Sequence, residues 1–457
     1  MAAGESPLTL GTRSIGRLLL QYSVPAVIAS TVTSLYNIID SIFIGRGVGA
    51  LAITGLAITF PLMNLVIAFC LLIAVGGSTI SSIFLGQKDF DKATNVLHNV
   101  VLLSLIHAVV FGGLSLIWLD DILRLFGATP ETLPYARDFM AIILLGTPIA
   151  FVFISLNNVM RATGYPSKAM ISALLSVGVN VVLAPIFIFG FKWGIRGAAL
   201  ATVCGQTAAC IWVVAHFFSR KSFVRFSRSA RWFVPSIARK IYAIGLSPFL
   251  INVCACVVVV FINKSLLDYG GADGNMAVGA FGIVNRVTMF FLMVVMGITQ
   301  GMQPILGYNY GAGRWDRVKK TLRLGIWVGS AVTIFGFIVT ELFPDEVTRM
   351  FTDDATLIRL SRDGFRIVLL CYPLIGAAIV IQNFFQSIGK PQLSIFLSVT
   401  RQLVFLLPLL LILPGIWGVD GVWLSMAGSD FISFVITVVT LAVVQRRLNR
   451  KFKTLQK

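Results

Sequence analysis

Long apolar segments occupy most of this chain and are separated by short polar stretches. Each segment offers about 20 apolar residues or more, which is enough for a helix to cross roughly 30 Å of hydrocarbon. The segments are continuously apolar rather than alternating, and this favours helices over the strands of a membrane barrel. We therefore predict an all-α integral membrane protein of twelve transmembrane helices. The predicted spans are residues 18–45, 54–83, 95–118, 135–159, 167–191, 197–219, 240–266, 277–307, 321–343, 364–387, 391–413 and 419–445.

The composition agrees with a bilayer environment. Charged residues make up 12% of the chain and hydrophobic residues 57%, whereas a soluble domain carries about 25% charged residues. The net charge of +18 would suggest nucleic-acid binding in a soluble protein. Here the basic residues lie between apolar segments, so we interpret them as membrane-flanking loops and expect no nucleic-acid partner. All six cysteines fall inside apolar segments, and we expect neither a metal nor another cofactor.

The distribution of Lys and Arg predicts the orientation. With the N-terminus inside, 25 of the 37 basic residues fall in cytoplasmic stretches, and only Arg286 and Arg401 lie well within spans, away from their ends. The positive-inside rule then predicts that both termini are cytoplasmic. The first seventeen residues are polar, with Arg13 and Arg17 just before the first span, and show no cleavable signal peptide.

A basic stretch at 220–240 divides the chain in the middle and carries four aromatic residues. Such a composition predicts an interfacial linker helix beside anionic lipid. It separates an N-terminal six-helix bundle, residues 1–219, from a C-terminal six-helix bundle with a basic cytoplasmic tail, residues 241–457.

The two halves repeat one another at an offset of 223–225 residues. The matched pairs are Pro25 and Pro248, Gly76 and Gly301, Gly86 and Gly311, Pro148 and Pro373, Asn158 and Asn383, Gly164 and Gly389, Pro166 and Pro391, and Trp193-Gly194 and Trp417-Gly418. Glycine and proline fix turns, kinks and close helix contacts, so their repetition indicates a repeated backbone. Six spans per half make the repeats parallel, with a pseudo-twofold axis along the membrane normal.

Parallel repeats suit alternating access, in which two bundles rock around a central site. The sequence has no Walker motif, no selectivity-filter pattern and no Ser/His/Asp set, and its three histidines, His98, His107 and His216, are scattered. We therefore predict a secondary transporter rather than a channel or an enzyme.

Several motifs resemble the multidrug and toxic compound extrusion (MATE) family, and the bacterial MepA-like group in particular. They are Pro25…Tyr36-Asn37-x-x-Asp40-x-x-Phe43-Ile44-Gly45, Asn157-Asn158-Val-Met-Arg161-Ala-Thr-Gly164-Tyr-Pro166, its repeat Gln382-Asn383-Phe-Phe-Gln386-Ser-Ile-Gly389-Lys-Pro391, Asn180-x-x-Leu183-x-Pro185-Ile-Phe187 and Gly194-x-x-Gly197-Ala-Ala-x-Ala-Thr202. The resemblance implies a V-shaped, monomeric pair of bundles in the bacterial inner membrane. It also implies export of amphiphilic, often cationic compounds, driven by inward flow of H⁺ or Na⁺.

Asp40 and Asp430 are the acidic residues that lie well within apolar spans. A charge at the centre of a bilayer costs about 2.5 kcal/mol or more on insertion scales and usually faces a cavity or a partner. Helix depth allows Asp40, Asn180 and Thr202 to meet in the outer half of the N-terminal bundle. In the family, the matching positions contribute to a cation site, so we predict Asp40 as the coupling residue. The alternative is a carboxylate that only holds helices together.

The chain departs from the family pattern at Ala184, where many relatives carry Asp. The loss of that carboxylate favours H⁺ over Na⁺ as the coupling ion. Another branch of the family uses acidic residues in spans seven and ten, but this chain has Cys256, Asn263 and Ala378 in those regions. Asp430 is predicted to pair with Arg286 or Arg401, with a structural role and a coupling role both open.

The predicted substrate cavity combines amide, aromatic and thioether side chains, because amides and a carboxylate offset the desolvation of a cation and Met adapts to varied shapes. Its residues are Tyr36, Asn37, Asn157, Asn158, Met160, Met289 and Met293. The main alternative function is a lipid-linked oligosaccharide flippase of the same superfamily, for which only Arg286 and Arg401 could supply a basic cavity. A membrane sensor or enzyme is a second alternative.

Overall fold

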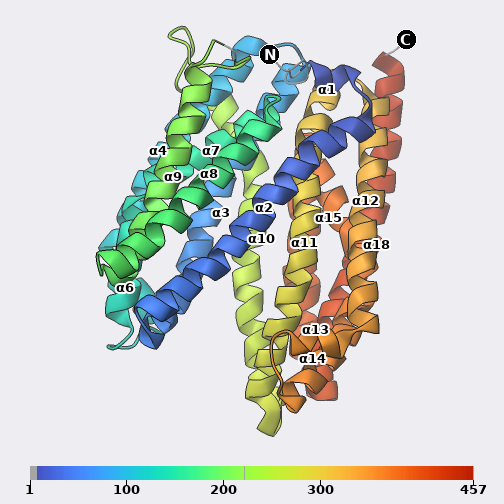
Figure 1. The fold of residues 1–457 in the computed structure, drawn as a ribbon. Helices are drawn as coiled ribbons and strands as arrows, with labels where there is room; N and C mark the ends of the chain where they lie inside the picture. The colour runs from blue at the N-terminus through green and yellow to red at the C-terminus, as the bar shows by residue number, and fades with distance from the viewer. Residues whose placement is uncertain (1–7, 221, 456–457) are drawn as a thin grey trace.

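The computed structural model describes residues 8–220 and 222–455, and these residues form helices joined by short loops (Figure 1). The first half contains α1 (Thr9–Thr12), α2 (Ile15–Gly47), α3 (Ala50–Gly86), α4 (Phe90–Ile117), α5 (Leu119–Leu125), α6 (Leu133–Leu145), α7 (Thr147–Ala162), α8 (Pro166–Pro185), the π-helix η1 (Ile186–Gly190) and α9 (Gly194–Phe218). The second half contains α10 (Pro235–Tyr269), η2 (Gly271–Asp273), α11 (Gly274–Gly311), α12 (Trp315–Leu342), α13 (Pro344–Arg349), α14 (Ala355–Val368), η3 (Leu369–Cys371), α15 (Tyr372–Ser387), α16 (Pro391–Val399), the π-helix η4 (Thr400–Leu406), α17 (Leu407–Ile412) and α18 (Pro414–Leu455).

The twelve predicted spans are present. Within the described residues, eleven helical segments are long and apolar enough to cross a membrane, and α6 with α7 forms the twelfth as a pair bent by 56°. Pro148 stands at the start of α7, and its repeat Pro373 stands at the start of α15. Proline fits the first turn of a helix because its missing N–H has no partner there. The fourth and tenth spans are therefore each interrupted just before a matched proline.

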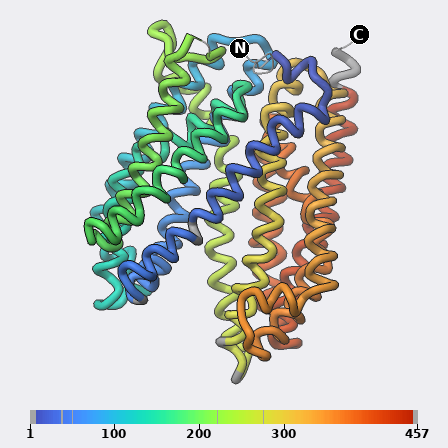
Figure 2. The backbone as a smooth tube through the Cα atoms, viewed as in Figure 1, coloured from blue at the N-terminus to red at the C-terminus, as the bar shows by residue number. Residues whose placement is uncertain are grey.

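The spans gather into two bundles, one from each half of the chain (Figures 1 and 2). Both ends of the described chain lie at the same end of the molecule, here called the terminal end. The two bundles lie against each other near the terminal end and diverge toward the opposite, far end. The fold class expected from the sequence is thus confirmed.

The backbone repeats as the sequence does. Gly194 and Gly418 follow matched tryptophans, and both adopt left-handed φ angles, 56° and 57°. At Gly418 this conformation kinks α18 near its beginning. Because residues with a Cβ rarely adopt such angles, the repeated glycines preserve the same turn in both bundles.

The linker between the bundles differs from the prediction. Its described residues 222–234 form turns, and helix α10 begins at Pro235. The predicted interfacial helix is therefore wrong for this segment. The segment folds back onto α4, where the side-chain oxygens of Asn95 and Asn99 accept two loop N–H groups at 3.0 and 2.9 Å. These amides satisfy backbone donors that a helix would have satisfied internally.

Helix α2 belongs to both bundles and runs diagonally between them (Figure 1). Near the terminal end, Leu19 is buried in a core made largely by the C-terminal bundle, and Ser23 Oγ donates to the Ile298 carbonyl of α11 at 3.3 Å. Near the far end, Ile44 is buried in a core of the N-terminal bundle. The first span is therefore a mechanical link between the two halves.

Close backbone contacts join the bundles in the terminal half. A Cβ at Gly245 of α10 would lie 1.6 Å from the Leu72 carbonyl oxygen of α3, and one at Gly76 would lie 2.1 Å from the Ile241 carbonyl oxygen. Small residues allow helices in a membrane to approach this closely. Gln303 of α11 also crosses to α3, because its amide donates to Ser78 Oγ at 2.9 Å and to Thr79 Oγ1 at 2.6 Å.

The segment before α2 is held by the C-terminal bundle. Asn309 Nδ2 and Arg317 Nη2 donate to the carbonyl of Leu10 at 3.0 and 3.1 Å. Arg314 donates to the Gly11 carbonyl, and Arg317 also reaches the Arg13 carbonyl. The first helical turn of the chain is thereby attached to α11 and α12, and this contact fixes the terminal end of α2.

The glycine contacts predict a specific stability effect. Gly245→Ala should force α3 and α10 apart and lower the free energy of unfolding by about 1–3 kcal/mol, in the range of overpacked cores. Gly113→Ala in α4 is the matched control, since no heavy atom lies within 4 Å of its Cβ position. Thermal unfolding of the two purified variants in detergent measures the difference. Equal stability would contradict the close contact.

Candidate functional site

Three predicted polar residues meet inside the N-terminal bundle. Asn180 Nδ2 on α8 lies 3.0 Å from the Tyr36 hydroxyl of α2 and 3.0 Å from Thr202 Oγ1 of α9. The Tyr36 and Thr202 oxygens are themselves 3.0 Å apart, and Thr202 Oγ1 also lies 3.1 Å from the Ala198 carbonyl. The side chains come from three different spans, so this contact depends on how those spans pack.

Local sequence places these side chains together. Gly205 allows α9 to approach α8, since a Cβ there would lie 2.3 Å from the Ser176 carbonyl oxygen. Directly after Pro185, α8 continues into the π-helix η1. A π-helical turn is rare and often occurs at functional sites, where it changes which side chains face a neighbour.

Asp40 follows Tyr36 by one helical turn and interacts with it electrostatically. Its side chain is 8% exposed, and its Oδ1 atom is buried without a hydrogen-bond partner among the described residues. The Oδ1 atom of Asn180 is also buried and unpartnered. None of the ion pairs found in the described part of the chain includes Asp40. Two buried acceptor oxygens, one on Asp40 and one on Asn180, thus have no hydrogen-bond donor among the described residues, and such atoms are suited to a proton or a small cation.

The position next to this network carries no oxygen. Ala184 lies one turn after Asn180 on α8 and is fully buried. Ala184 therefore adds no oxygen to the amide and the two hydroxyl groups that meet at Asn180.

The C-terminal bundle contains a different arrangement. Asp430 on α18 pairs with Arg401 of the π-helix η4, with Nε and Oδ1 2.8 Å apart. The prediction of an in-span pair is confirmed, and Arg401 is the partner. Arg286 lies exposed on α11 and takes part in no ion pair of the described residues.

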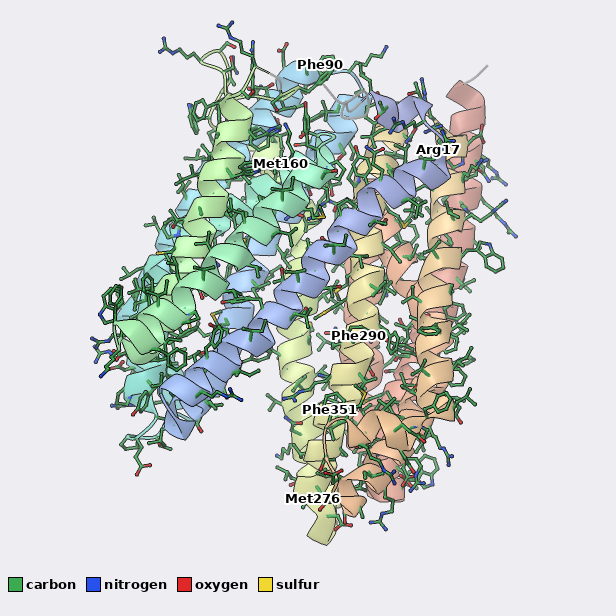
Figure 3. The ribbon with its side chains drawn as sticks, viewed as in Figure 1. Arg17, Phe90, Met160, Met276, Phe290 and Phe351 are labelled. Atoms are coloured by element: carbon green, nitrogen blue, oxygen red, sulfur yellow. The ribbon has the colours of Figure 1, made fainter. Side chains whose placement is uncertain are left out.

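Three predicted cavity residues are engaged within the N-terminal bundle. Asn157 is buried and donates to the Ala169 carbonyl at 2.9 Å and to Ser172, both on α8. Asn158 donates to the Ile154 carbonyl of its own helix at 2.9 Å. Met160 is fully buried in a core, in the half of this bundle nearer the termini (Figure 3).

The predicted residues of α11 lie nearer to the contact between bundles. Met293 Sδ accepts a hydrogen bond from Ser34 Oγ of α2 at 2.8 Å, and Met289 is 42% exposed. The side chain of Asn37 lies outside the described residues. Met293 therefore contacts α2 from the C-terminal bundle, whereas Tyr36 reaches from α2 into the N-terminal bundle.

Two participants were missed by sequence reasoning. Ser34 contacts Met293, and Arg161 lies within α7 and donates to Gln300 Oε1 of α11. Arg161 thus joins the two bundles. The motif that contains Arg161 was visible, but nothing in the sequence indicated that its guanidinium crosses to the other half.

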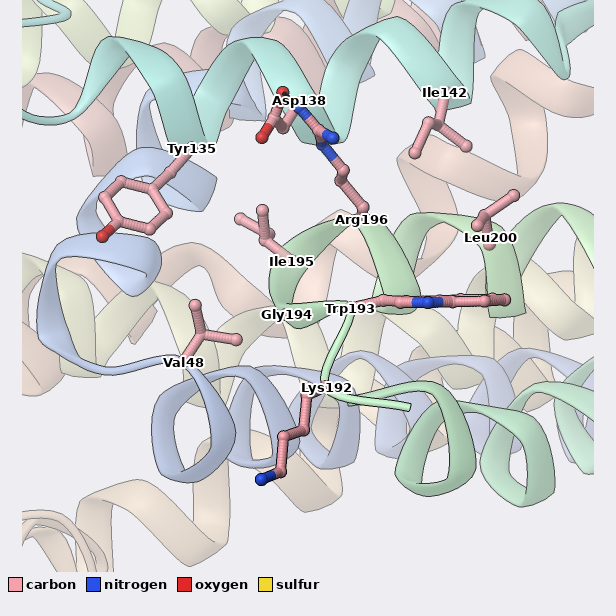
Figure 4. Close-up of a pocket in the computed structure, with 10 residues that line it drawn as sticks. All are labelled: Val48, Tyr135, Asp138, Ile142, Lys192, Trp193, Gly194, Ile195, Arg196 and Leu200. Carbon is pink, nitrogen blue, oxygen red and sulfur yellow. Dashed lines mark hydrogen bonds and ion pairs between the residues drawn. The ribbon is translucent and has the colours of Figure 1, made fainter. Parts of the chain in front are cut away.

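A separate cavity of about 580 Å³ lies at the far end of the N-terminal bundle (Figure 4). It is lined by Val48, Tyr135, Asp138, Ile142, Lys192, Trp193, Gly194, Ile195, Arg196 and Leu200. Arg196 and Asp138 form an ion pair of 2.8 Å across it. The cavity includes none of the predicted site residues.

Comparison with known proteins identifies the family. The MatE family profile matches residues 25–186 and 243–412, one stretch in each bundle. The chain belongs to the MatE family. Among curated MatE-type proteins, it is 27% identical to the multidrug export protein MepA of Staphylococcus haemolyticus, over 95% of each chain. It is 25% identical to MepA of Staphylococcus saprophyticus, again over 95% of each chain.

Solved structures of MATE transporters share the fold. The MATE multidrug transporter DinF-BH, solved in complex with a small-molecule ligand, is 36% identical, with a TM-score of 0.87 over 94% of this chain and 96% of that one. An outward-facing multidrug resistance MATE family transporter of the MOP superfamily has a TM-score of 0.91 at 23% identity, over 98% of this chain and 99% of that one. This chain is accordingly a member of a family of multidrug efflux transporters.

The hydrogen-bond network predicts a stability effect. Thr202→Val removes the oxygen that contacts both Asn180 and Tyr36, and should cost about 0.5–2 kcal/mol of unfolding free energy. Thr207→Val is the matched control on the same helix, since Thr207 Oγ1 donates to its own helix at Val203. Thermal unfolding of both purified proteins measures the effect. A larger loss in the Thr207 variant would contradict the importance of the network.

Proposed function

We propose that this protein is a secondary active antiporter that exports amphiphilic, often cationic compounds in exchange for protons. The observation that carries the proposal is the environment of Asp40: a buried carboxylate without an ion-pair partner in the described chain, one helical turn from Tyr36 and on the helix that both bundles share. Such a group is costly to keep ionised in a membrane, so it readily exchanges a proton or a cation.

The substrate class is supported by relatives and by the chemistry of the contact between bundles. MepA proteins are named as multidrug export proteins, and DinF-BH was solved with a small molecule bound. Along α2 and α11, Tyr36, Ser34 and Met293 offer an aromatic ring, a hydroxyl and a thioether. These groups suit flat apolar molecules, and the Asp40 carboxylate attracts a positive charge.

The basic loops support an orientation with the terminal end in the cytoplasm. The stretches with the most Lys and Arg, including 220–240 and the C-terminal tail, lie at that end, as expected for cytoplasmic loops of an inner-membrane protein. The glycine contacts between α3 and α10 then close the cytoplasmic side, and the diverging far ends face outward.

Coupling follows from the position of Asp40 on α2. Protonation removes the negative charge from the far half of α2, which packs on the N-terminal bundle, while the terminal half remains bound to α11. A change of charge therefore acts on the helix that links the bundles. A bound cationic substrate and a bound proton each neutralise the same carboxylate, so binding of one excludes the other and uptake of a proton accompanies release of the substrate.

The fully buried Ala184 supports protons over Na⁺ as the coupling ion. Na⁺ is held by several oxygen ligands, whereas a single carboxylate suffices to carry a proton. The flippase alternative loses support because Asp430 neutralises Arg401, an arginine on which a basic cavity would depend.

Replacement of Asp40 tests the proposal. Asp40→Asn keeps the size and hydrogen-bonding capacity of the side chain but cannot be ionised, so dye efflux from proteoliposomes under an imposed pH gradient without Na⁺ should fall to the level of liposomes without protein. Asp420→Asn, at an exposed position of α18, is the control and should retain efflux. Unchanged efflux in Asp40→Asn would refute the assigned role.

A change at position 184 tests the identity of the coupling ion. Ala184→Asp places a second carboxylate one turn from Asn180, and the repulsion between two carboxylates favours a bound cation. We expect this variant, but neither the unaltered protein nor Ala184→Asn, to take up radioactive Na⁺ during drug efflux. Na⁺ uptake by the unaltered protein would contradict proton coupling.

A further inference from the structure

The ion pair Arg401–Asp430 lies within the C-terminal bundle and has no part in the mechanism above. Asp430 shares a helix face with Trp423, Ser433 and Thr437, each at most 3% exposed. Its side chain is 9% exposed and that of Arg401 is 30% exposed, with 2.8 Å between Nε and Oδ1. A carboxylate placed this deep in a span requires a positive charge or a proton.

The other groups around Asp430 cannot supply that charge. Cys371 and Tyr372, at the break between η3 and α15, are the further titratable groups that interact with it electrostatically within the described chain. The Tyr372 hydroxyl donates to the Thr288 carbonyl at 2.7 Å. Arg401 is therefore the one cation in described contact with the Asp430 carboxylate.

The backbone at Arg401 is irregular where the ion pair forms. Thr400–Leu406 is a π-helix just before Pro408, and it includes Arg401. The neighbouring Gln402 has a buried Oε1 atom without a hydrogen-bond partner. A π-helical turn and an unpartnered oxygen also occur in the N-terminal bundle, at η1 and Asn180.

The internal repeat shows which positions of the two bundles correspond. With the offset of the matched tryptophans, Thr202 corresponds to Met426, so Asp430 lies one turn beyond the position equivalent to Thr202. With the offset of Pro25 and Pro248, Asp40 corresponds to Asn263, whose buried Oδ1 is again unpartnered. The two bundles thus each carry a largely buried carboxylate well within a span, and among the described ion pairs an arginine neutralises Asp430 but not Asp40.

We propose that Asp430 is a second site for a monovalent cation, a proton or Na⁺, and that Arg401 permanently occupies it with its own guanidinium. The inference deepens the proposed function, on which it rests: with Asp430 filled, Asp40 alone exchanges an ion in each cycle. The C-terminal bundle then moves without a change of charge, and the ion gradient acts on the N-terminal bundle. Arg401 is accordingly a positioning residue that determines the number of coupled ions.

Proton binding in full-length protein purified in detergent tests this site. All variants carry Asp40→Asn, so the result does not depend on whether Asp40 couples transport. On acidification in Na⁺-free buffer, addition of Arg401→Gln should increase uptake by one proton per protein molecule relative to the Asp40→Asn parent. Arg401→Lys, which keeps the positive charge, and Arg401→Gln with Asp430→Asn, which removes the carboxylate, should show no increase.

Na⁺ distinguishes the two cations. If the opened site takes Na⁺ as well as a proton, radioactive Na⁺ binds to the Arg401→Gln protein in alkaline buffer and is absent from the Asp430→Asn combination. If it takes a proton alone, the increase in proton uptake is independent of Na⁺. An Arg401→Gln protein that gains neither a proton nor Na⁺ would overturn the proposal.

Thermal unfolding keeps the proposal testable if Arg401→Gln is unstable. We expect the unfolding temperature of this variant to rise on acidification or on addition of Na⁺ more than that of the combination with Asp430→Asn. If the combined variant remains folded and neither cation restores the stability of the Arg401→Gln protein, the pair serves only to hold η4 against α18. That result would also overturn the proposal.

Discussion

The attachment of α2 to both bundles is the constraint on which the rest of the structure depends. Its terminal half is fixed by Ser23 and by the arginine contacts of the preceding turn to α11 and α12. Its far half is buried in the N-terminal bundle, where Tyr36 joins Asn180 and Thr202. The bundles therefore cannot move apart without a change in α2, which contains Pro25, or in one of its two attachments.

The two bundles differ in how the free-energy cost of a carboxylate inside the membrane is offset. In the C-terminal bundle the charge of Asp430 is offset by Arg401 at 2.8 Å, and the pair needs nothing from outside. In the N-terminal bundle Asp40 is buried, its Oδ1 atom has no hydrogen-bond partner, and it forms no ion pair in the part of the chain that the structure describes. The two bundles thus share a scaffold but differ in how a buried charge is offset, and this difference underlies the proposal that the N-terminal bundle responds to ions.

Sequence reasoning succeeded where the backbone and helix depth decide the outcome. The twelve spans followed from segment length, and the repeated backbone followed from the matched glycines and prolines, of which Gly194 and Gly418 adopt the same left-handed turn. The meeting of Asn180 with Thr202 followed from depth along helices of known rise. The rotation of each helix about its axis was harder to predict, because a span that is apolar on every side gives little sign of which face points inward. Asn157, for example, faces α8 and donates to its Ala169 carbonyl. The linker was mispredicted because its backbone partners, such as Asn95, lie far away in sequence.

The central claim is that the charge of Asp40 controls how the two bundles sit relative to each other. It is tested most directly by the distance between spin labels at Leu125 and Met350, which are more than four-fifths exposed on α5 of the first half and after α13 of the second, in protein whose six native cysteines have been replaced. The account predicts that this distance distribution shifts between mildly alkaline and mildly acidic buffer, and that Asp40→Asn holds it at the acidic distribution in both. An equal response to pH in the Asp40→Asn protein would contradict the account.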